Sequence, residues 1–189
     1  TRPDSGRTKL NLAHMQPNLT ILNRYTGVIT HQAQLNDARL SIRHLAHLPN
    51  RAIGIALQYE QVNGNTAMPV AAIWQPEASI KLLETPGESF NRAQGYAASA
   101  ASDGLNYFVV SCPKANAVMV WTVQGQWLWT LNVPSAYGLA AMPQCNCLAV
   151  SSENGGIYYF DTQTWQEKTT LRQTFDVQWD NHLIAYRRG

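Results

Sequence analysis

Four segments of this chain repeat one pattern, in which an apolar run, a polar turn and a second run of β-branched or aromatic residues follow one another. Turn-forming residues between such runs are typical of β-hairpins. The turns recur at intervals of roughly 40–50 residues, which is the spacing of a repeat architecture. They begin at Asn23, Gln75, Thr122 and Asp161.

A second set of hairpins alternates with the first, as in "SIRHLAHLPNRAIGIALQYE" from Ser41 and "YGLAAMPQCNCLAVSSE" from Tyr137. Each member predicts a strand, a tight turn and a more apolar strand. The first strands carry small residues, as in Ala97–Ala101 and Gly138–Ala141, which suits strands crowded around an axis. The turns are expected at Pro49-Asn50, Asp103-Gly104, Pro143-Gln144 and Asp180-Asn181.

Two alternating hairpins make a four-stranded unit of about 40–50 residues, and no amphipathic helix of about ten or more residues interrupts the pattern. We therefore predict an all-β chain that forms one domain over residues 1–189. Its architecture is a β-propeller or half-propeller, with three complete four-stranded blades and a half-blade at each end. An all-β sandwich is the alternative, but a sandwich does not require the two hairpin types to alternate. The complete blades are expected at Ser41–Pro86, Gly95–Pro134 and Ser135–Leu171.

The two terminal half-blades allow two arrangements. Either they complete one blade between them and close a four-bladed ring, or the chain belongs to a larger propeller. In the second arrangement the sheets at the two ends have unpaired edge strands, and such edges tend to pair with another chain. We therefore expect any protein partner, including a second copy in a homodimer, to bind through open blade edges or the channel face.

The charge pattern excludes several classes of partner. Charged residues make up 14% of the chain, the net charge is +2, and Lys and Arg do not cluster. We therefore expect no nucleic acid or anionic membrane as a partner. No apolar run approaches the roughly 18–20 residues that a membrane span needs. No metal-ligand spacing, phosphate loop or G-x-S-x-G motif is present, so no metal, cofactor or catalytic residue is predicted.

The three cysteines, Cys112, Cys145 and Cys147, are predicted to be small buried residues in strands. Cys145 and Cys147 are two positions apart and would share one face of a strand, which is a poor geometry for a disulfide between them. The same spacing supplies too few ligands for a metal site.

Arg43 and His44 stand at the start of an expected inner strand, which places them near the channel mouth. Alternation along a strand sends one side chain towards a neighbouring blade and the other the opposite way. One interpretation is a ligand site, with Arg43 contacting an anion or carboxylate and His44 as a hydrogen-bonding or metal partner. The other is a hydrogen bond between blades.

Residues 1–18 form an expected long loop on the same channel face. Long loops in compact domains are often functional. Arg7, Lys9 and Asn11 offer donors to an anionic ligand, or they pack the loop over the channel as a plug.

The opening stretch, with Pro3–Arg7, Lys9–Leu12 and Met15–Pro17, together with "SIRHLA" from Ser41, resembles a bacterial propeller family known as domain of unknown function 1513. The resemblance runs through most of the chain and implies a WD40- or YVTN-like propeller. Members are about twice this length, carry an export signal, and are often encoded beside periplasmic iron-uptake components, including imelysin-like proteins. The first residues contain no start Met and no signal sequence, so we expect a mature form or a fragment. The resemblance implies that the chain is the C-terminal half of a periplasmic propeller of about seven blades.

Together these features predict a non-catalytic periplasmic binding or scaffold propeller, associated with iron acquisition through the family resemblance. The alternative is an enzyme whose active site lies in the channel mouth and uses Arg43 and His44. Active sites of propellers assemble side chains from distant blades, so a missing local motif does not decide between the two.

Overall fold

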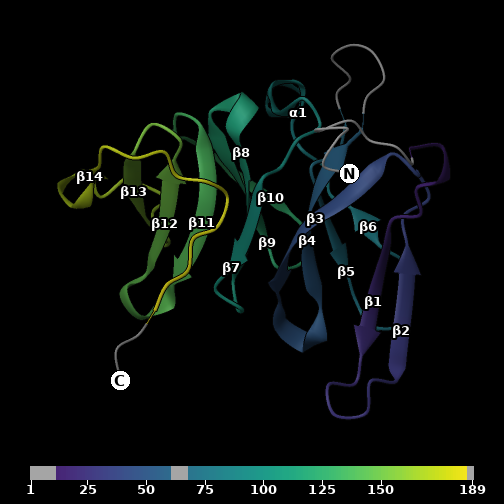
Figure 1. Cartoon of the computed structure of the whole chain (residues 1–189). Coiled ribbons are helices and arrows are strands. Elements are labelled where there is room, and N and C mark those ends of the chain that lie inside the picture. Colours follow the sequence, from purple (N-terminus) through teal and green to yellow (C-terminus); the bar gives the residue numbers. More distant parts are fainter. Residues whose placement is uncertain (1–11, 61–67, 187–189) are drawn as a thin grey trace.

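A computed structural model describes residues 12–60 and 68–186 of the chain. Its strands form three antiparallel four-stranded sheets and one two-stranded sheet, arranged side by side (Figure 1). The first four-stranded sheet contains β3 (Leu40–His47), β4 (Ile53–Tyr59), β5 (Ala71–Trp74) and β6 (Lys81–Leu82). The second contains β7 (Ser99–Ser102), β8 (Tyr107–Cys112), β9 (Ala117–Thr122) and β10 (Trp127–Asn132). The third contains β11 (Ala136–Met142), β12 (Cys147–Ser152), β13 (Gly156–Asp161) and β14 (Gln173–Thr174).

Each four-stranded sheet follows the chain order from one edge to the other, as a propeller blade does. β7 packs against both β3 and β11, so the first strands of the three blades lie together. These are the inner strands that the small residues predicted. The β-propeller prediction and the expected order of three complete blades are therefore confirmed.

Alternating side chains bury both faces of the middle blade. In β8, Phe108 and Val110 pack towards the first blade, whereas Tyr107 and Val109 pack towards the third. Successive side chains of a strand point to opposite faces, so a strand between two sheets must be apolar at nearly every position. This explains the continuous apolar run that begins at Tyr107.

The two ends of the chain differ from each other. The predicted outer hairpin near the N-terminus forms as β1 (Asn18–Leu22) and β2 (Ile29–Gln34), and Leu19 and Leu35 pack on the first blade. The predicted hairpin near the C-terminus is wrong, because Phe175–Tyr186 contains no strand. Isolated two-stranded hairpins are marginal in water. This segment instead passes the turn between β12 and β13 and then runs beside β11 (Figure 1). The two ends therefore do not complete a common blade within the described residues.

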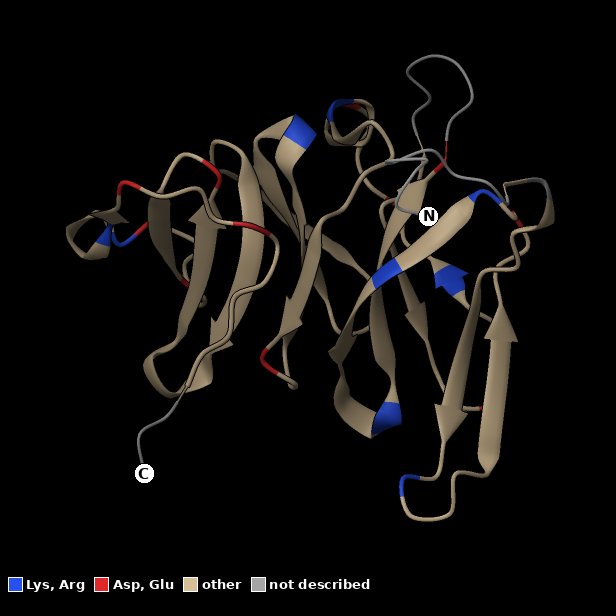
Figure 2. Cartoon of the chain, in the orientation of Figure 1, with Lys and Arg blue, Asp and Glu red and all other residues tan. Residues whose placement is uncertain are grey.

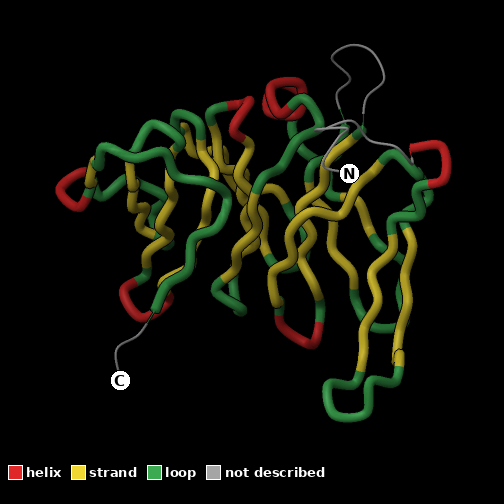
Figure 3. Tube along the Cα trace, in the orientation of Figure 1, coloured by secondary structure: helices red, strands yellow, loops and turns green. Residues whose placement is uncertain are grey.

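Short helices occupy the connections between strands (Figure 3). The 3₁₀ turns are η2 (Leu12–His14), η3 (Pro49–Arg51), η4 (Pro113–Ala115), η5 (Pro143–Cys145) and η6 (Thr169–Leu171). Three of them begin with proline and contain or precede a left-handed asparagine, namely Asn50, Asn116 and Asn146. Proline fixes the first dihedral of such a turn and asparagine tolerates the left-handed conformation.

One α-helix, α1 (Gly87–Ala93), joins the first blade to the second, and the repeat pattern did not predict it. Its Arg92 donates to the carbonyl of Ala115 at 2.7 Å, which anchors the helix on the second blade. Within residues 12–60 and 68–186, no helix is long and apolar enough to cross a membrane.

Candidate functional site

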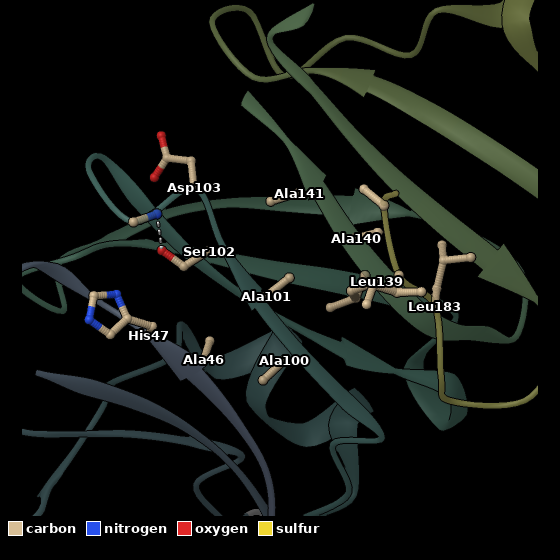
Figure 4. Close-up of a pocket in the computed structure, with 13 residues that line it drawn as sticks. Ala46, His47, Ala100, Ala101, Ser102, Asp103, Leu139, Ala140, Ala141 and Leu183 are labelled. Atoms are coloured by element: carbon tan, nitrogen blue, oxygen red, sulfur yellow. Dashed lines mark hydrogen bonds between the residues drawn. The ribbon is translucent and has the colours of Figure 1, made fainter. Parts of the chain in front are cut away.

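The inner strands of the three blades and the segment after Asn181 line an open cavity of about 450 Å³, which we call the axial groove (Figure 4). Apolar side chains, most of them alanine, dominate its floor, and they are Ala46, Ala100, Ala101, Leu139, Ala140 and Ala141. His47, Ser102 and Asp103 lie on one side of the groove, and Leu183 lies on the other (Figure 4). The groove therefore combines an apolar floor with a polar rim.

Asp103 belongs to the turn between β7 and β8, which the sequence predicted. Its carboxylate accepts hydrogen bonds from the backbone N–H groups of Leu105, Asn106 and Tyr107 at 2.8–3.2 Å. Burial alone would raise the pKa of Asp103, but these hydrogen bonds and the Asn106 side chain hold it below its usual value. The rim therefore carries a fixed negative charge.

His44 lies beside an adjoining cavity of about 270 Å³, which shares Ala100 and Leu139 with the axial groove. The Asn181 amide donates to Nε2 of His44 at 2.9 Å and to the carbonyl of Ala98 at 3.2 Å. Because an amide nitrogen only donates, Nε2 of His44 accepts, and the neutral ring carries its proton on Nδ1.

The electrostatic surroundings of His44 agree with this neutral form. Burial lowers the pKa of His44, and the nearby charges of His182 and Arg43 lower it further, whereas Asp180 acts in the opposite direction. The rings of His44 and His182 are 5.2 Å apart between centroids. An uncharged imidazole thus sits at the edge of the groove near neutral pH.

Arg43 takes a different place from His44. The pairing of β3 with β4 shifts between Ile42 and His44, so Arg43 is the extra residue of a β-bulge. Its side chain is exposed and lines neither cavity. The structure therefore does not bring Arg43 and His44 into one site, and the role of Arg43 in ligand contact stays a prediction.

Arg7, Lys9 and Asn11 lie outside the described residues, so their position relative to the groove also stays a prediction. Sequence reasoning missed Asn181 and His182 as partners of His44. No local signal points to this contact, because 137 positions separate His44 from Asn181.

Charged groups are spread over the described surface. Lys and Arg lie on separate elements and alternate with Asp and Glu (Figure 2). Among residues 12–60 and 68–186, no group of three or more His, Cys, Asp or Glu side chains is placed to hold a metal ion.

Comparison with solved structures finds a propeller-like neighbour. A streptogramin B lyase structure superposes with a TM-score of 0.55 and 16% sequence identity, over 82% of this chain and 46% of the other. This chain thus spans less than half of that structure, and the likeness concerns the fold. No curated protein matches the sequence. A family model described as "Protein of unknown function (DUF1513)" matches residues 1–186, so the chain belongs to the DUF1513 family.

Proposed function

We propose that this chain is part of a non-catalytic binding propeller of the bacterial periplasm, and that its axial groove receives a segment of a partner protein. The observation that supports this proposal is the groove itself, with an alanine-rich floor of the inner strands and the polar rim around Asp103. Concave sites with apolar walls and a few polar groups are the usual binding sites of proteins. The association with iron acquisition rests on the family resemblance.

The way the chain's own C-terminal segment lies in the axial groove supports an extended peptide as the ligand of this groove. Leu183, Ile184 and Ala185 line the groove without forming a strand. Asn181 anchors the segment through His44 and the carbonyl of Ala98. The inner face of the blades thus accepts an extended chain, held by side-chain hydrogen bonds.

A photo-crosslinking amino acid at Ala100 in native cells tests this binding function. Ala100 lines the groove, whereas Ala78 is exposed in the turn after β5 and serves as the control position. We expect a crosslinked protein band from position 100 and none from position 78. Equal crosslinking from both positions, or none from position 100, would refute the groove as the binding site.

An enzyme acting beside His44 is the second candidate. The specific observation is the neutral His44, whose ring borders a cavity and whose lowered pKa suits proton acceptance near neutral pH. The propeller neighbour is a streptogramin B lyase, so a streptogramin B is a reasonable first substrate to test. Chromatographic conversion by the wild type but not by His44→Gln supports this candidate, and no conversion counts against it for this substrate.

Periplasmic location and the link to iron are tested in the native bacterium. We expect the full-length protein in the periplasmic fraction, released with a periplasmic marker enzyme. We also expect its deletion to reduce growth under iron chelation. Cytoplasmic fractionation would refute the location, and unchanged growth would refute the link to iron.

A further inference from the structure

Cys145 and Cys147 flank one residue of unusual conformation at the start of the third blade's second strand. Cys145 ends the η5 turn and is exposed, whereas Cys147 begins β12 and is only 3% exposed. The prediction that both cysteines share one face of a strand is therefore wrong. Asn146 between them adopts the left-handed conformation, with φ 49° and ψ 47°.

The conformation of Asn146 brings the two cysteines close. Helix-like dihedrals of either hand place the Cα atoms of the flanking residues about 5.4 Å apart, compared with about 6.7 Å in a strand. Disulfides have Cα separations of about 4.4–6.8 Å, most often 5.5–6 Å. The amide N–H of Thr162 donates to the carbonyl of Asn146 at 2.9 Å and helps to hold this turn. The Cα separation that the Asn146 dihedrals set is thus within the range found in disulfides.

The two thiols are also placed differently for reaction. Cys145 lines a cavity of about 290 Å³ and is open to reagents. Burial raises the pKa of the Cys147 thiol, and the adjacent Cys145 thiol raises it further by hydrogen bonding, whereas Lys168 acts in the opposite direction. Lys168 is held in place by an ion pair with Asp161 at 2.9 Å, and Asp161 lies opposite Cys147 in the sheet.

A buried hydroxyl provides a second, independent observation. Tyr107 of the middle blade is 2% exposed, and its hydroxyl has no hydrogen-bond partner in the described structure. Burial raises the pKa of Tyr107, with further contributions from Asp103, Cys147 and Cys145. Tyr107 thus keeps its phenolic proton, and its buried hydroxyl is a donor without a partner among the described residues.

We propose that Cys145 and Cys147 form a reversible dithiol–disulfide pair that exchanges with an external disulfide. The thiolate of Cys145 attacks one sulfur of that disulfide, forms a mixed disulfide and releases the first thiol. The thiolate of Cys147 then attacks the sulfur of Cys145, closes the Cys145–Cys147 bond and releases the second thiol. The chain loses two protons and two electrons, and the external disulfide gains them as it becomes two thiols. Strained or partly exposed disulfides are reduced more readily than structural ones, so an external thiol reverses the reaction.

Oxidised glutathione is the probe for this reaction. The reduced chain is incubated with it, the remaining thiols are alkylated in denaturant, and peptides are analysed by mass. In the wild type we expect the peptide with both cysteines to lose two hydrogens and to take up no alkyl group. Cys147→Ser should stop at the glutathione adduct on Cys145, and Cys145→Ser should remain unreacted.

Cys112 supplies the internal control, because it is fully buried. We expect Cys112 to be alkylated in denaturant. We also expect the Cys112→Ser variant to form the Cys145–Cys147 disulfide as the wild type does. A wild-type chain that stays unreacted, keeps a glutathione adduct on Cys145, or forms a bond to Cys112 would overturn the proposal.

Lys168→Met tests the resolving step separately. Loss of the ammonium should slow closure of the ring by roughly threefold to tenfold and let the mixed disulfide accumulate. Lys114→Met, on the η4 turn, is the matched control and should close at the wild-type rate. Equal rates for the two variants would show that Lys168 does not assist Cys147 and would overturn that part of the proposal.

Discussion

Substitution of Gly54 by alanine tests the packing between the first two blades. Gly54 lies on β4, and a methyl group there would come within 2.5 Å of two ring carbons of Phe108 and 2.9 Å of a third. Phe108 is fully buried in the cluster between these blades, so its ring cannot swing into solvent. Overpacking of a well-filled core costs about 1–3 kcal/mol. We expect Gly54→Ala to lower the free energy of unfolding by this amount.

Urea unfolding followed by tryptophan fluorescence measures this loss, since Trp121 is buried in the same cluster. Gly87→Ala is the matched control, because no atom lies within 4 Å of the methyl it would add. Its effect should stay within about 0.5 kcal/mol. Phe108→Leu frees space next to Gly54, so the double variant should lose about 0.5–3 kcal/mol less than the sum of the two single variants.

Two results would refute this reasoning. If Gly54→Ala is as stable as the wild type, the first two blades can move apart at this contact with no loss in the free energy of unfolding. Additive effects of Gly54→Ala and Phe108→Leu would mean that the two positions do not touch, and the arrangement of the first two blades would then be wrong.

Three further predictions concern charged and titrating groups. Asp103→Ala removes the acceptor of three backbone N–H groups. We expect it to lower the free energy of unfolding, measured with urea, by about 1–2 kcal/mol. Hydrogen bonds to charged groups are often worth more than this, but the partial exposure of Asp103 reduces the loss. The hydrogen bond from Lys168 lowers the pKa of Asp161 to about 2, so its stabilisation is present above about pH 4 and is lost as the pH falls towards 2. Acid titration of Asp161→Asn should therefore show a flatter stability curve in this range. The pKa of His44 is lower in the folded chain than in the unfolded chain, where it is about 6.5. As the pH falls through this value, the unfolded chain binds the proton more readily than the folded chain. Stability should drop there, and His44→Gln should reduce that drop in urea unfolding between pH 5 and 8.

The blades were predictable because local pattern and tertiary packing agree in them. The predicted turns at Gln75, Thr122 and Asp161 coincide with the ends of β5, β9 and β13. Such hairpins need only short-range signals, namely turn formers between alternating or continuous apolar runs. Small residues identified two of the three inner strands, β7 and β11, whereas β3 carries larger side chains.

The C-terminal segment shows where this reasoning fails. Leu183–Tyr186 has the apolar character of a strand, yet it forms none, because strand formation depends on a neighbour that accepts its backbone hydrogen bonds. The bulge at Arg43 is a second feature that the sequence did not predict, because strict alternation was assumed through β3.

Three polar residues of the candidate site, His44, Asp103 and Asn181, each lie at or next to an interruption of regular strand pairing. His44 adjoins the bulge of β3, Asp103 lies in the turn after β7, and Asn181 belongs to a segment without strand pairing. Regular strands of the blades must satisfy both backbone hydrogen bonding and apolar packing on their faces, which leaves little freedom for polar side chains. Where strand pairing is interrupted, a side chain need not pack on the apolar face of a blade, and it can point into the groove. Substitutions of His44 and Asn181 should therefore alter binding with little loss of stability, whereas changes within β8 and β9 should act first on stability.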